Sequence, residues 1–593
     1  MAILMRLARP CGLVAALALA AALGAAPIHS AVAQTQEFAV ISLHDIADNP
    51  AGMDSSGVST DRLVTFFEWL IGNDWQAISL SDVESARRGE ARLPERAVLI
   101  TVDDGYASLY TRVYPLALAY EIPVLAALVG EWLDVPASGE VSYGGGKRPR
   151  SHFITWAQAR EMQASGLVEF ASHTYDLHHE ERANPQGNML AAGVTRRYDP
   201  ARGYESEADY AERLRADFER SRAQFEQQLG QSPRAMVWPY GRYNQASSKI
   251  AREIGFSYSL TLDPRPGRVP QAEDAAPYVI GRYLPTNNPP LGEWVHAMRF
   301  ADPWPNARRM VTVDPRDYAS DNPQEADERL GQALEALLEL GVTHVVINAV
   351  IVDASGQAQA AWFPTEQLPL RADVLSRLAA QIRTRAGVEL VLRLPHRAAL
   401  RGLGTAERVL KLFRDLGRSV PFDVLLVEQA ASFEDGRAVT TPWDVRALRA
   451  QLDTASWPAP DRLAMQVFYA ASAAHPGLKL FWLAPPDHDL TRPSALAELT
   501  LLPLRLDGAG ALPPQAERLI PGSVAARRTG LWWEASETVD AAALIEAVRA
   551  YQRHGGTSVL WHPQDLLRDQ PPAARLAPVV SARSFPAASA LRP

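Results

Sequence analysis

Short apolar runs alternate with longer amphipathic stretches along residues 38–303. The short runs predict buried strands, and the stretches whose apolar positions recur every three or four residues predict helices. The expected strands are 38–43, 97–102, 124–129, 167–171, 235–238 and 258–262, and the expected helices include 61–71, 156–165, 206–229 and 247–254. This alternation indicates α/β units around a parallel sheet. Two stretches rich in Gly, Pro, Arg and Asn, 137–151 and 180–204, are expected to form long surface loops.

A second alternating pattern begins after residues 301–306, where prolines interrupt both periodicities. Its expected strands are 310–313, 342–350, 388–394, 422–427, 478–483, 499–506, 530–533 and 557–561. Helices such as 324–340, 371–385, 406–416 and 541–553 separate many of them. Eight strands with intervening helices fit one (β/α)8 barrel. The sequence therefore predicts two α/β domains, at 38–303 and 308–575, followed by a flexible tail at 576–593.

The first residues of the chain have the pattern of an export signal. Arg6 and Arg9 precede an apolar run, and a small-x-small site follows it and ends at Ala33. This order is typical of a cleavable signal peptide, here residues 1–33. The run is short for a membrane span of about 20 residues, and Cys11 comes before it, whereas a lipoprotein carries its cysteine after it. The sequence thus predicts a periplasmic protein that is not a lipoprotein and whose mature chain has no membrane span.

Composition and charge narrow the possible partners. The 593 residues include 59 Lys and Arg against 68 Asp and Glu, which gives a formal net charge of −9. This acidic balance argues against a general binder of nucleic acid and leaves a neutral or cationic polymer as a partner. Because Cys11 is the only cysteine, a disulfide framework is excluded, and any metal must be held by histidines and carboxylates.

Four clusters of polar residues each come directly after an expected strand of the first domain. They are His44-Asp45, Asp103-Asp104-Gly105, the stretch SHTYDLHH at 172–179, and Pro239-Tyr240-Gly241. Because parallel strands end at one common edge, we expect the four clusters to meet there. Two imidazoles and one carboxylate can hold a divalent metal and leave positions open for water and substrate. Of the adjacent Asp103 and Asp104, one can bind the metal while the other remains a free base.

Three of these stretches resemble the first motifs of the polysaccharide deacetylase (NodB-homology) superfamily. They are TVDDG at 101–105, SHTYDLH at 172–178 and WPYG at 238–241. His44 resembles the catalytic-acid histidine of that superfamily, moved to the N-terminus by circular permutation. This permutation, and the five-residue step from His173 to His178, resemble the periplasmic poly-β-1,6-N-acetyl-D-glucosamine N-deacetylases of biofilm export systems. The stretches WFP at 362–364 and WHPQDLLRDQP at 561–571 extend a partial resemblance into the second domain.

The resemblance implies a circularly permuted (β/α) barrel followed by a glycoside-hydrolase-like, TIM-like (β/α)8 barrel. It implies a hydrolase that removes N-acetyl groups from poly-β-1,6-N-acetyl-D-glucosamine during export of the biofilm matrix. It also implies that Asp104, His173 and His178 bind a divalent cation, which this donor set leaves open as zinc, cobalt, nickel or iron. Asp103 is then the base that deprotonates the attacking water, and His44 is the acid that protonates the departing amine.

Three further residues near this site are less firmly assigned. The same resemblance implies that the backbone N–H of Tyr240 stabilises the oxyanion. Asp263 is a candidate for orienting the acid or the base, and it fits equally well as a turn residue before Pro264. His179 is the neighbour of His178, and spacing alone does not exclude it as a ligand, although the family pattern favours His178.

The second domain departs from relatives that hydrolyse glycosides, which carry an acidic cluster after a central strand. Here Glu428 stands at the expected strand end, and its neighbour Gln429 is an amide. Glycoside hydrolysis needs two carboxyl groups, and no spacing argument selects Asp353 or Asp487 as the second. We therefore expect this barrel to bind carbohydrate without hydrolysing it. The aromatic residues expected near strand ends fit either sugar stacking or barrel packing: Trp362, Phe363, Trp482, Trp532, Trp533 and Trp561.

The expected partners are poly-N-acetylglucosamine and an outer-membrane export porin. Two other functions stay open at this point. One keeps the chemistry but changes the substrate to peptidoglycan or chitin-like β-1,4 oligomers. The other is a non-catalytic polysaccharide-binding export factor, which the full set of acids and histidines in the first domain argues against.

Overall fold

The computed structural model describes residues 36–49, 52–263, 266–270, 277–299, 308–320, 322–428, 459–485, 487–490, 497–505, 512, 514–521, 523–534, 541–562, 566 and 580–581. The predicted signal peptide 1–33, the predicted boundary 301–306 and all but two residues of the predicted tail 576–593 lie outside this set. Within it, no helix combines the length and the apolar content that crossing a bilayer requires.

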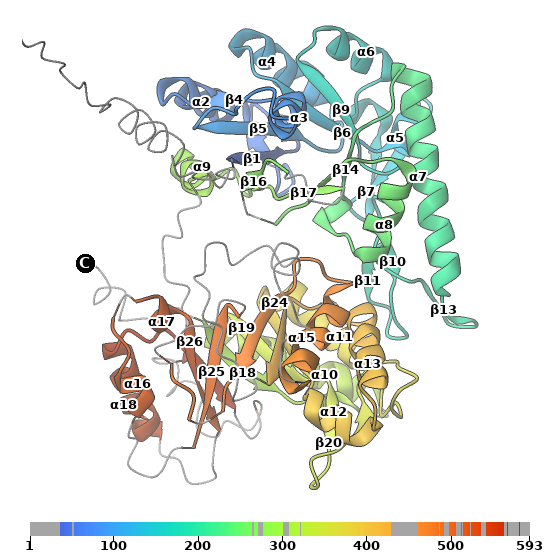
Figure 1. The fold of residues 1–593 in the computed structure, drawn as a ribbon. Coiled ribbons are helices and arrows are strands. Elements are labelled where there is room, and N and C mark those ends of the chain that lie inside the picture. The colour runs from blue at the N-terminus through green and yellow to red at the C-terminus, as the bar shows by residue number, and fades with distance from the viewer. Residues whose placement is uncertain are drawn as a thin grey trace, which may run out of the picture.

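The first domain is built on one sheet that curls into a nearly closed barrel (Figure 1). Its strand order is β16-β1-β5-β6-β9-β14-β15-β17, with β4 beside β5. The strands are β1 (Glu37–Leu43), β4 (Gln76–Ala77), β5 (Ala97–Val102), β6 (Val124–Leu128), β9 (Val168–Ser172), β14 (Ala235–Val237), β15 (Tyr258–Leu260), β16 (Gly267–Arg268) and β17 (Tyr278–Ile280). All pairs are parallel except β1 with β16. A bridge between Ile41 and Tyr283 brings the chain after β17 back to β1.

Helices cover the outside of this sheet, as the alternating pattern predicts. They are α2 (Thr60–Gly72), α3 (Leu80–Arg87), α4 (Tyr114–Tyr120), α5 (Gly130–Asp134), α6 (Trp156–Ala164), α7 (Glu207–Leu229), α8 (Gln245–Ile254) and α9 (Leu291–Met298). Local signals set their limits: α6 begins with a reciprocal capping box between Thr155 and Gln158. The left-handed Gly255 ends α8. Every residue of β5 is buried, as expected for a parallel strand covered on both faces.

The two stretches predicted as loops contain short hairpins, so that prediction is wrong in detail. Stretch 137–151 holds β7 (Glu140–Tyr143) paired with β8 (Gly146–Pro149). Stretch 180–204 holds β10 (Glu180–Arg182) with β11 (Met189–Ala191), and β12 (Tyr198–Asp199) with β13 (Gly203–Tyr204). These strands are two to four residues long and largely polar, so they lack the apolar alternation that identifies a strand in a sequence.

The second domain is a closed eight-stranded parallel barrel, which confirms the predicted (β/α)8 fold. Its strands are β18 (Arg309–Val313), β19 (His344–Asn348), β22 (Glu389–Arg393), β23 (Val424–Glu428), β24 (Lys479–Leu483), β25 (Leu499–Arg505), β26 (Thr529–Glu534) and β27 (Ser558–His562). The single strand predicted at 342–350 is wrong: it ends at Asn348, and β20 (Val350–Val352) forms a separate hairpin with β21 (Ala358–Ala361). The surrounding helices include α10 (Pro323–Leu340), α11 (Leu375–Gln381), α12 (His396–Leu403), α13 (Ala406–Ser419), α15 (Ala459–Ser472) and α18 (Ala541–Arg553).

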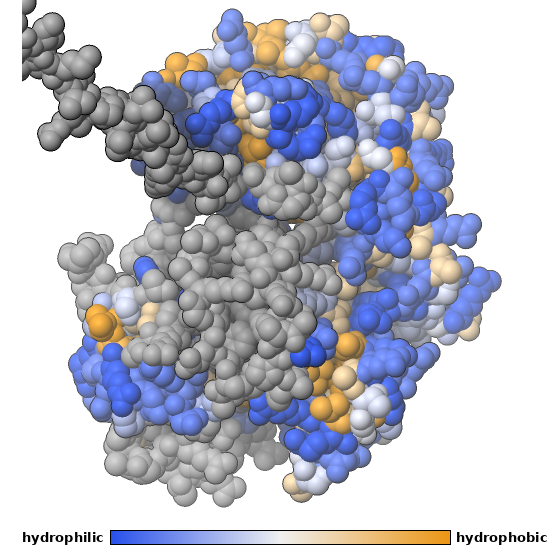
Figure 2. All heavy atoms as spheres, in the orientation of Figure 1, coloured by the Kyte–Doolittle hydropathy of each residue, from blue (hydrophilic) through white to orange (hydrophobic). Residues whose placement is uncertain are grey.

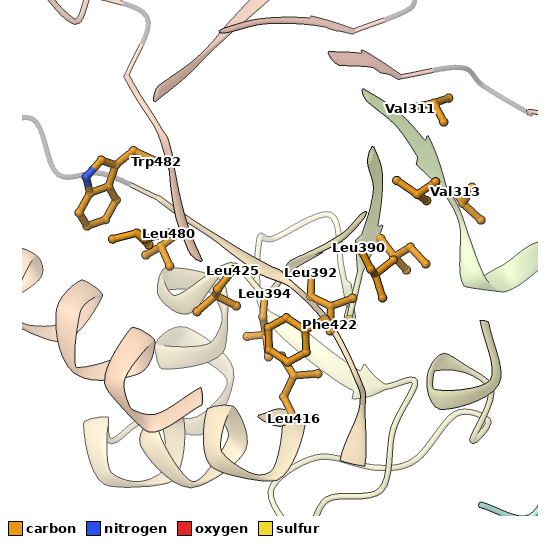
Figure 3. Close-up of a cluster of buried hydrophobic side chains, with 14 of the residues drawn as sticks. Val311, Val313, Leu390, Leu392, Leu394, Leu416, Phe422, Leu425, Leu480 and Trp482 are labelled. Carbon is orange, nitrogen blue, oxygen red and sulfur yellow. The ribbon is translucent and has the colours of Figure 1, made fainter. Parts of the chain in front are cut away.

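Alternate side chains of these strands enter two different cores. Met310, Val391 and Phe481 belong to a cluster that fills the barrel interior, whereas their neighbours Val311, Leu390 and Leu480 belong to the larger cluster between barrel and helices. Part of that larger cluster is drawn in Figure 3. It also contains five of the six aromatic residues singled out from the sequence, which therefore pack the fold: Trp362, Phe363, Trp482, Trp533 and Trp561. The sixth, Trp532, belongs to the interior cluster.

The two domains contact each other directly. The Tyr204 hydroxyl, at the end of the β12–β13 hairpin, donates to Oδ2 of Asp373 at 2.8 Å. The backbone N–H of Gln245, at the start of α8, donates to the carbonyl of Ala473 at 2.6 Å. Among the described residues on the face shown in Figure 2, hydrophobic ones form only small patches between hydrophilic ones. The hairpins of the first domain thus serve partly as its contact with the second.

Candidate metal centre and active site

Three of the seven non-glycine residues with positive φ in the described part of the first domain each follow a strand of its sheet. Asp104 follows β5 with φ of 71°, Thr174 follows β9 with φ of 69°, and Tyr240 follows β14 with φ of 57°. Such conformations cost about 1–3 kcal/mol each and persist where surrounding structure enforces them, often at functional sites. Asp104, Thr174 and Tyr240 thus place strained backbone at the carboxyl edge, where the sequence predicts that the polar clusters meet.

Asp104, His173 and His178 form a compact cluster with the geometry of a metal site. Oδ1 of Asp104 lies 3.3 Å from Nε2 of His173 and 3.2 Å from Nε2 of His178. The three candidate ligand atoms all lie within 4.8 Å of one another, and the two histidines and the acid come from different turns. Oδ1 is buried and accepts no hydrogen bond within the described part of the chain. Two imidazoles and a carboxylate so arranged fit a divalent cation with open coordination positions.

A second hydrogen bond orients His173. Its Nδ1 lies 2.7 Å from the carbonyl oxygen of Val237, the last residue of β14. Since a carbonyl only accepts, Nδ1 carries the proton and the Nε2 lone pair is free to bind a metal. The chain thus fixes the tautomer that a ligand histidine needs.

The charges of the cluster act on one another. Burial raises the pKa of Asp104, but His178 and His173 offset it, so that this pKa lies well below its usual value. Burial lowers the pKa of His173, but the neighbouring carboxylates of Asp104 and Asp103 leave it raised overall. Both directions show that positive charge beside these carboxylates is favoured, which is the condition for holding a cation.

Asp103 lies beside the cluster and is held by Arg282, a residue that the sequence reasoning missed. Nη1 of Arg282 donates to Oδ1 of Asp103 at 2.7 Å and Nη2 donates to Oδ2 at 2.9 Å. Nη1 also donates to Oγ1 of Thr101 and Nε to the carbonyl of Thr261. Burial raises the pKa of Asp103, but Arg282, His173 and His44 more than offset this, so its pKa lies below the ordinary value. The carboxylate therefore stays ionised in a buried position.

His44 follows β1 and lies on the other side of Asp103. Its Nε2 is 4.0 Å from Oδ2 of Asp103, and its side chain is 12% exposed. Burial lowers the pKa of His44, and the charges of Asp104 and Asp103 only partly counteract this. The structure thus places the proposed acid and the proposed base side by side.

Tyr240 and His179 take different positions relative to the cluster. The Tyr240 ring lies 4.8 Å from the His178 ring and is 41% exposed, so it borders the open side of the site. The Nε2 of His179 lies 3.0 Å from Oε1 of Glu181, and its ring is not part of the metal-binding group. Of the two adjacent histidines, the structure groups His178 with Asp104.

Asp263 lies elsewhere. Its carboxylate faces Gly477 of the second domain, where an added Cβ would come within 3.3 Å of both oxygens, and it acts electrostatically on Arg242. Orientation of Asp103, the role considered for Asp263, falls to Arg282. An apolar strand followed by an arginine, YVIGR at 278–282, is the signal that could have pointed to it.

In the second domain, Glu428 ends β23 at the carboxyl edge of the barrel. Its Oε2 lies 3.9 Å from Nδ1 of the buried His396. Close by, the Arg393 guanidinium lies over the Trp532 ring, 4.9 Å from its centre. Asp353 is engaged in its own hairpin by Ser355 and Gln359, and Gln429 lies outside the described residues.

Comparisons with known proteins bear on both domains. Residues 90–259 match the family described as Polysaccharide deacetylase, and residues 313–398 match the family described as Hypothetical glycosyl hydrolase family 13. An Escherichia coli K12 protein named Poly-beta-1,6-N-acetyl-D-glucosamine N-deacetylase is 35% identical over 362 residues, which are 60% of this chain and 53% of that protein. The chain thus spans about half the length of the E. coli relatives it matches.

Two solved structures each match less than half of the chain. A de-N-acetylase from Aggregatibacter actinomycetemcomitans is 37% identical with a TM-score of 0.40, and the match covers 42% of this chain and 94% of that one. The deacetylase domain of BpsB from Bordetella bronchiseptica is 38% identical with a TM-score of 0.37, and the match covers 42% and 95% respectively.

Proposed function

This chain carries a polysaccharide deacetylase domain followed by a glycosyl-hydrolase-like barrel, and on that premise we propose that it is a metal-dependent N-deacetylase of poly-β-1,6-N-acetyl-D-glucosamine. The observation that carries the proposal is the Asp104–His173–His178 group, of which the first two are buried, beside an ionised Asp103. The substrate is proposed from the 35% identical E. coli protein, whose name specifies this polymer.

Asp103 acts as the base in this proposal. A divalent cation held by Asp104, His173 and His178 would polarise the acetamide carbonyl and lower the pKa of the attacking water. Asp103 accepts the proton of that water as its oxygen bonds to the carbonyl carbon. Arg282 donates to each carboxylate oxygen, and the Ser42 hydroxyl also donates to Oδ2 at 3.5 Å. Oδ1 therefore keeps a second lone pair for the proton.

His44 acts as the acid. As the carbon–nitrogen bond breaks, His44 donates a proton to the departing nitrogen, and acetate and a glucosamine amine leave. Nε2 of His44 is 4.0 Å from Oδ2 of Asp103. The proton that Asp103 takes from water can therefore pass to His44 and replace the one that His44 donates. The backbone N–H of Tyr240, on the open side of the site, is proposed to stabilise the oxyanion.

We propose that the second barrel binds the deacetylated polymer without cutting it. Deacetylation makes each glucosamine unit cationic, and the chain carries a net charge of −9. Glu428, at the carboxyl edge, is a candidate contact for an ammonium group. Binding of partly deacetylated glucan should therefore weaken as salt rises, and salt-independent binding would contradict this role.

The proposed location is the periplasm, with an outer-membrane export porin as a partner. The basis is the signal-like pattern of residues 1–33 and the polymer that the relatives' name specifies. Fractionation of cells that express the full chain, with N-terminal sequencing of the product, tests it. A product that keeps residues 1–33 and stays in the cytoplasm would contradict the location.

An acetate-release assay tests the main proposal. The full chain is incubated with matched β-1,6- and β-1,4-linked N-acetylglucosamine oligomers, after chelation and after return of Zn²⁺, Co²⁺, Ni²⁺ or Fe²⁺. We expect metal-dependent acetate release from the β-1,6 oligomer above that from the β-1,4 oligomer. A preference for β-1,4 would favour peptidoglycan or chitin-like substrates. No release with any metal, together with polymer export that survives loss of Asp103, would favour a binding role.

A further inference from the structure

The β7–β8 hairpin carries a tyrosine over the metal-binding group. The Tyr143 hydroxyl donates to Oδ2 of Asp104 at 3.3 Å. Its ring stacks on the imidazole of His178, with centroids 6.1 Å apart and planes 14° from parallel. One side chain thus touches two of the three proposed ligands, although nothing in the proposed reaction uses it.

The two carboxylate oxygens of Asp104 make different contacts. Oδ1 faces both histidines, and Oδ2 accepts the Tyr143 hydroxyl. A carboxylate with one oxygen engaged in this way presents the other in a fixed direction, whereas a free carboxylate can rotate or bind through both oxygens. Partners behind a metal ligand commonly change metal affinity or activity 10- to 100-fold when they are lost.

Neighbouring aromatic side chains hold Tyr143 in place. The Tyr106 hydroxyl is hydrogen-bonded to that of Tyr143. The Trp132 ring lies edge-on to Tyr143 at 5.3 Å and to His178 at 4.9 Å. Phe153 lies against the same ring at 6.2 Å. Tyr143 therefore belongs to a built aromatic wall.

The hairpin itself is fastened to the domain at both of its strands. Val141 of β7 is 1% exposed and belongs to the core of the first domain. Arg148 of β8 lies 3.6 Å from Asp54, in the turn before the short strand Val58–Ser59. The tip at Gly144 and Gly145 has positive φ at both residues, which suits a tight hairpin turn. The segment predicted as a surface loop is thus a hairpin, anchored in the core by Val141, that carries Tyr143 to the site.

We propose that Tyr143 is a positioning residue for the metal centre: its hydroxyl fixes Asp104 so that Oδ1 alone faces the cation, and its ring holds His178. The proposal rests on the metal dependence proposed above. It means that tight metal binding needs the β7–β8 hairpin in place over the site, in addition to the three ligands.

Metal affinity of the full chain tests this directly. Tyr143→Phe keeps the ring and removes the hydroxyl, and the affinity for Zn²⁺ and Co²⁺ is measured by competition with a chromogenic chelator. We expect at least a tenfold loss of affinity and a shifted visible spectrum of the Co²⁺-loaded protein. Tyr110→Phe is the matched control, because Tyr110 also donates to a carboxylate, that of Glu161, outside the site. The control should keep the wild-type affinity and spectrum.

The outcomes separate the two proposals. If the wild-type chain binds no divalent metal, the metal-dependent function fails. If it binds metal and Tyr143→Phe binds within twofold of it with an unchanged Co²⁺ spectrum, only the role of Tyr143 fails. Thermal melting of the metal-free proteins checks that each variant folds.

Tyr106→Phe is the second variant, because it removes only the hydroxyl that supports Tyr143. It should lower the metal affinity by a smaller factor than Tyr143→Phe does. Unchanged metal affinity in both variants would overturn the proposal.

Discussion

Arg282 donates two hydrogen bonds to Asp103, one to each carboxylate oxygen, at 2.7 and 2.9 Å, and both side chains are almost fully buried. A carboxylate buried without such a partner would favour its neutral form. The pair thus reconciles two needs of a base in this site: exclusion of solvent and retention of negative charge. It also ties β5 to the chain after β17, across the sheet.

Arg282→Met should shift the acid side of the pH profile. Arg282 lowers the pKa of Asp103, so its loss raises that pKa, and the base becomes protonated at a higher pH as pH falls. We expect kcat/KM to fall at a higher pH than in the wild type, so that the acid limb is displaced to higher pH. Arg160→Met is a surface control and should leave the profile unchanged. An acid limb at the wild-type position would refute the link between the two residues.

Asp103→Asn should abolish acetate release while the metal remains bound. The amide keeps the size of the side chain but cannot accept the proton of water, and none of the proposed ligand atoms is lost. Acetate release is measured beside metal content by atomic absorption. Activity near the wild-type level would remove Asp103 from the base role, and loss of the metal would make it part of the ligand set.

Asp104→Ala should lose both metal and activity. The substitution removes the oxygen that lies between His173 and His178 and leaves two ligands. We expect substoichiometric metal after dialysis and no acetate release above background. A variant that retains a full equivalent of metal would show that the cation binds elsewhere.

The sequence could predict the strands that build the site because most of their residues are buried and apolar. β5, with its six buried residues, was predicted at its observed limits, and the polar clusters follow such strands in the sequence itself. The eight strands of the second barrel could be predicted for the same reason. The sequence does not show which side chains of a strand face the barrel interior. Met310 belongs to the interior cluster and Val311 to the outer one, yet both are apolar.

What the sequence could not supply is contact between distant segments. Arg282 lies 179 residues from Asp103, and an arginine after a strand is common. Tyr143 reaches Asp104 from a hairpin of four-residue strands in a stretch whose composition indicates a loop. Asp263 follows a predicted strand, which makes it a candidate for orienting the acid or the base. In the structure its carboxylate faces Gly477 of the second domain instead.

A carboxylate on α7 offers a last test, this time of the loop that carries both histidines. Oδ1 and Oδ2 of Asp217 accept the backbone N–H groups of Tyr175 and Asp176, at 2.9 and 2.7 Å. Burial nevertheless raises the pKa of Asp217 from 3.8 to about 6, because those two bonds only partly offset desolvation. The loop between His173 and His178 is therefore fastened by a group that costs free energy when it is charged.

The sign of the pH effect follows from that shift. Between pH 4 and 6 the folded state binds more protons at Asp217 than the unfolded state, so the stability due to this group falls as pH rises through the window. The difference between 3.8 and about 6 corresponds to at most about 3 kcal/mol. The unfolding free energy of the wild type minus that of Asp217→Asn should thus decrease by up to this amount from pH 4 to 7. Asp209→Asn, on the first turn of α7, is the control, and a difference that is flat with pH for Asp217→Asn would show that Asp217 does not titrate in this range.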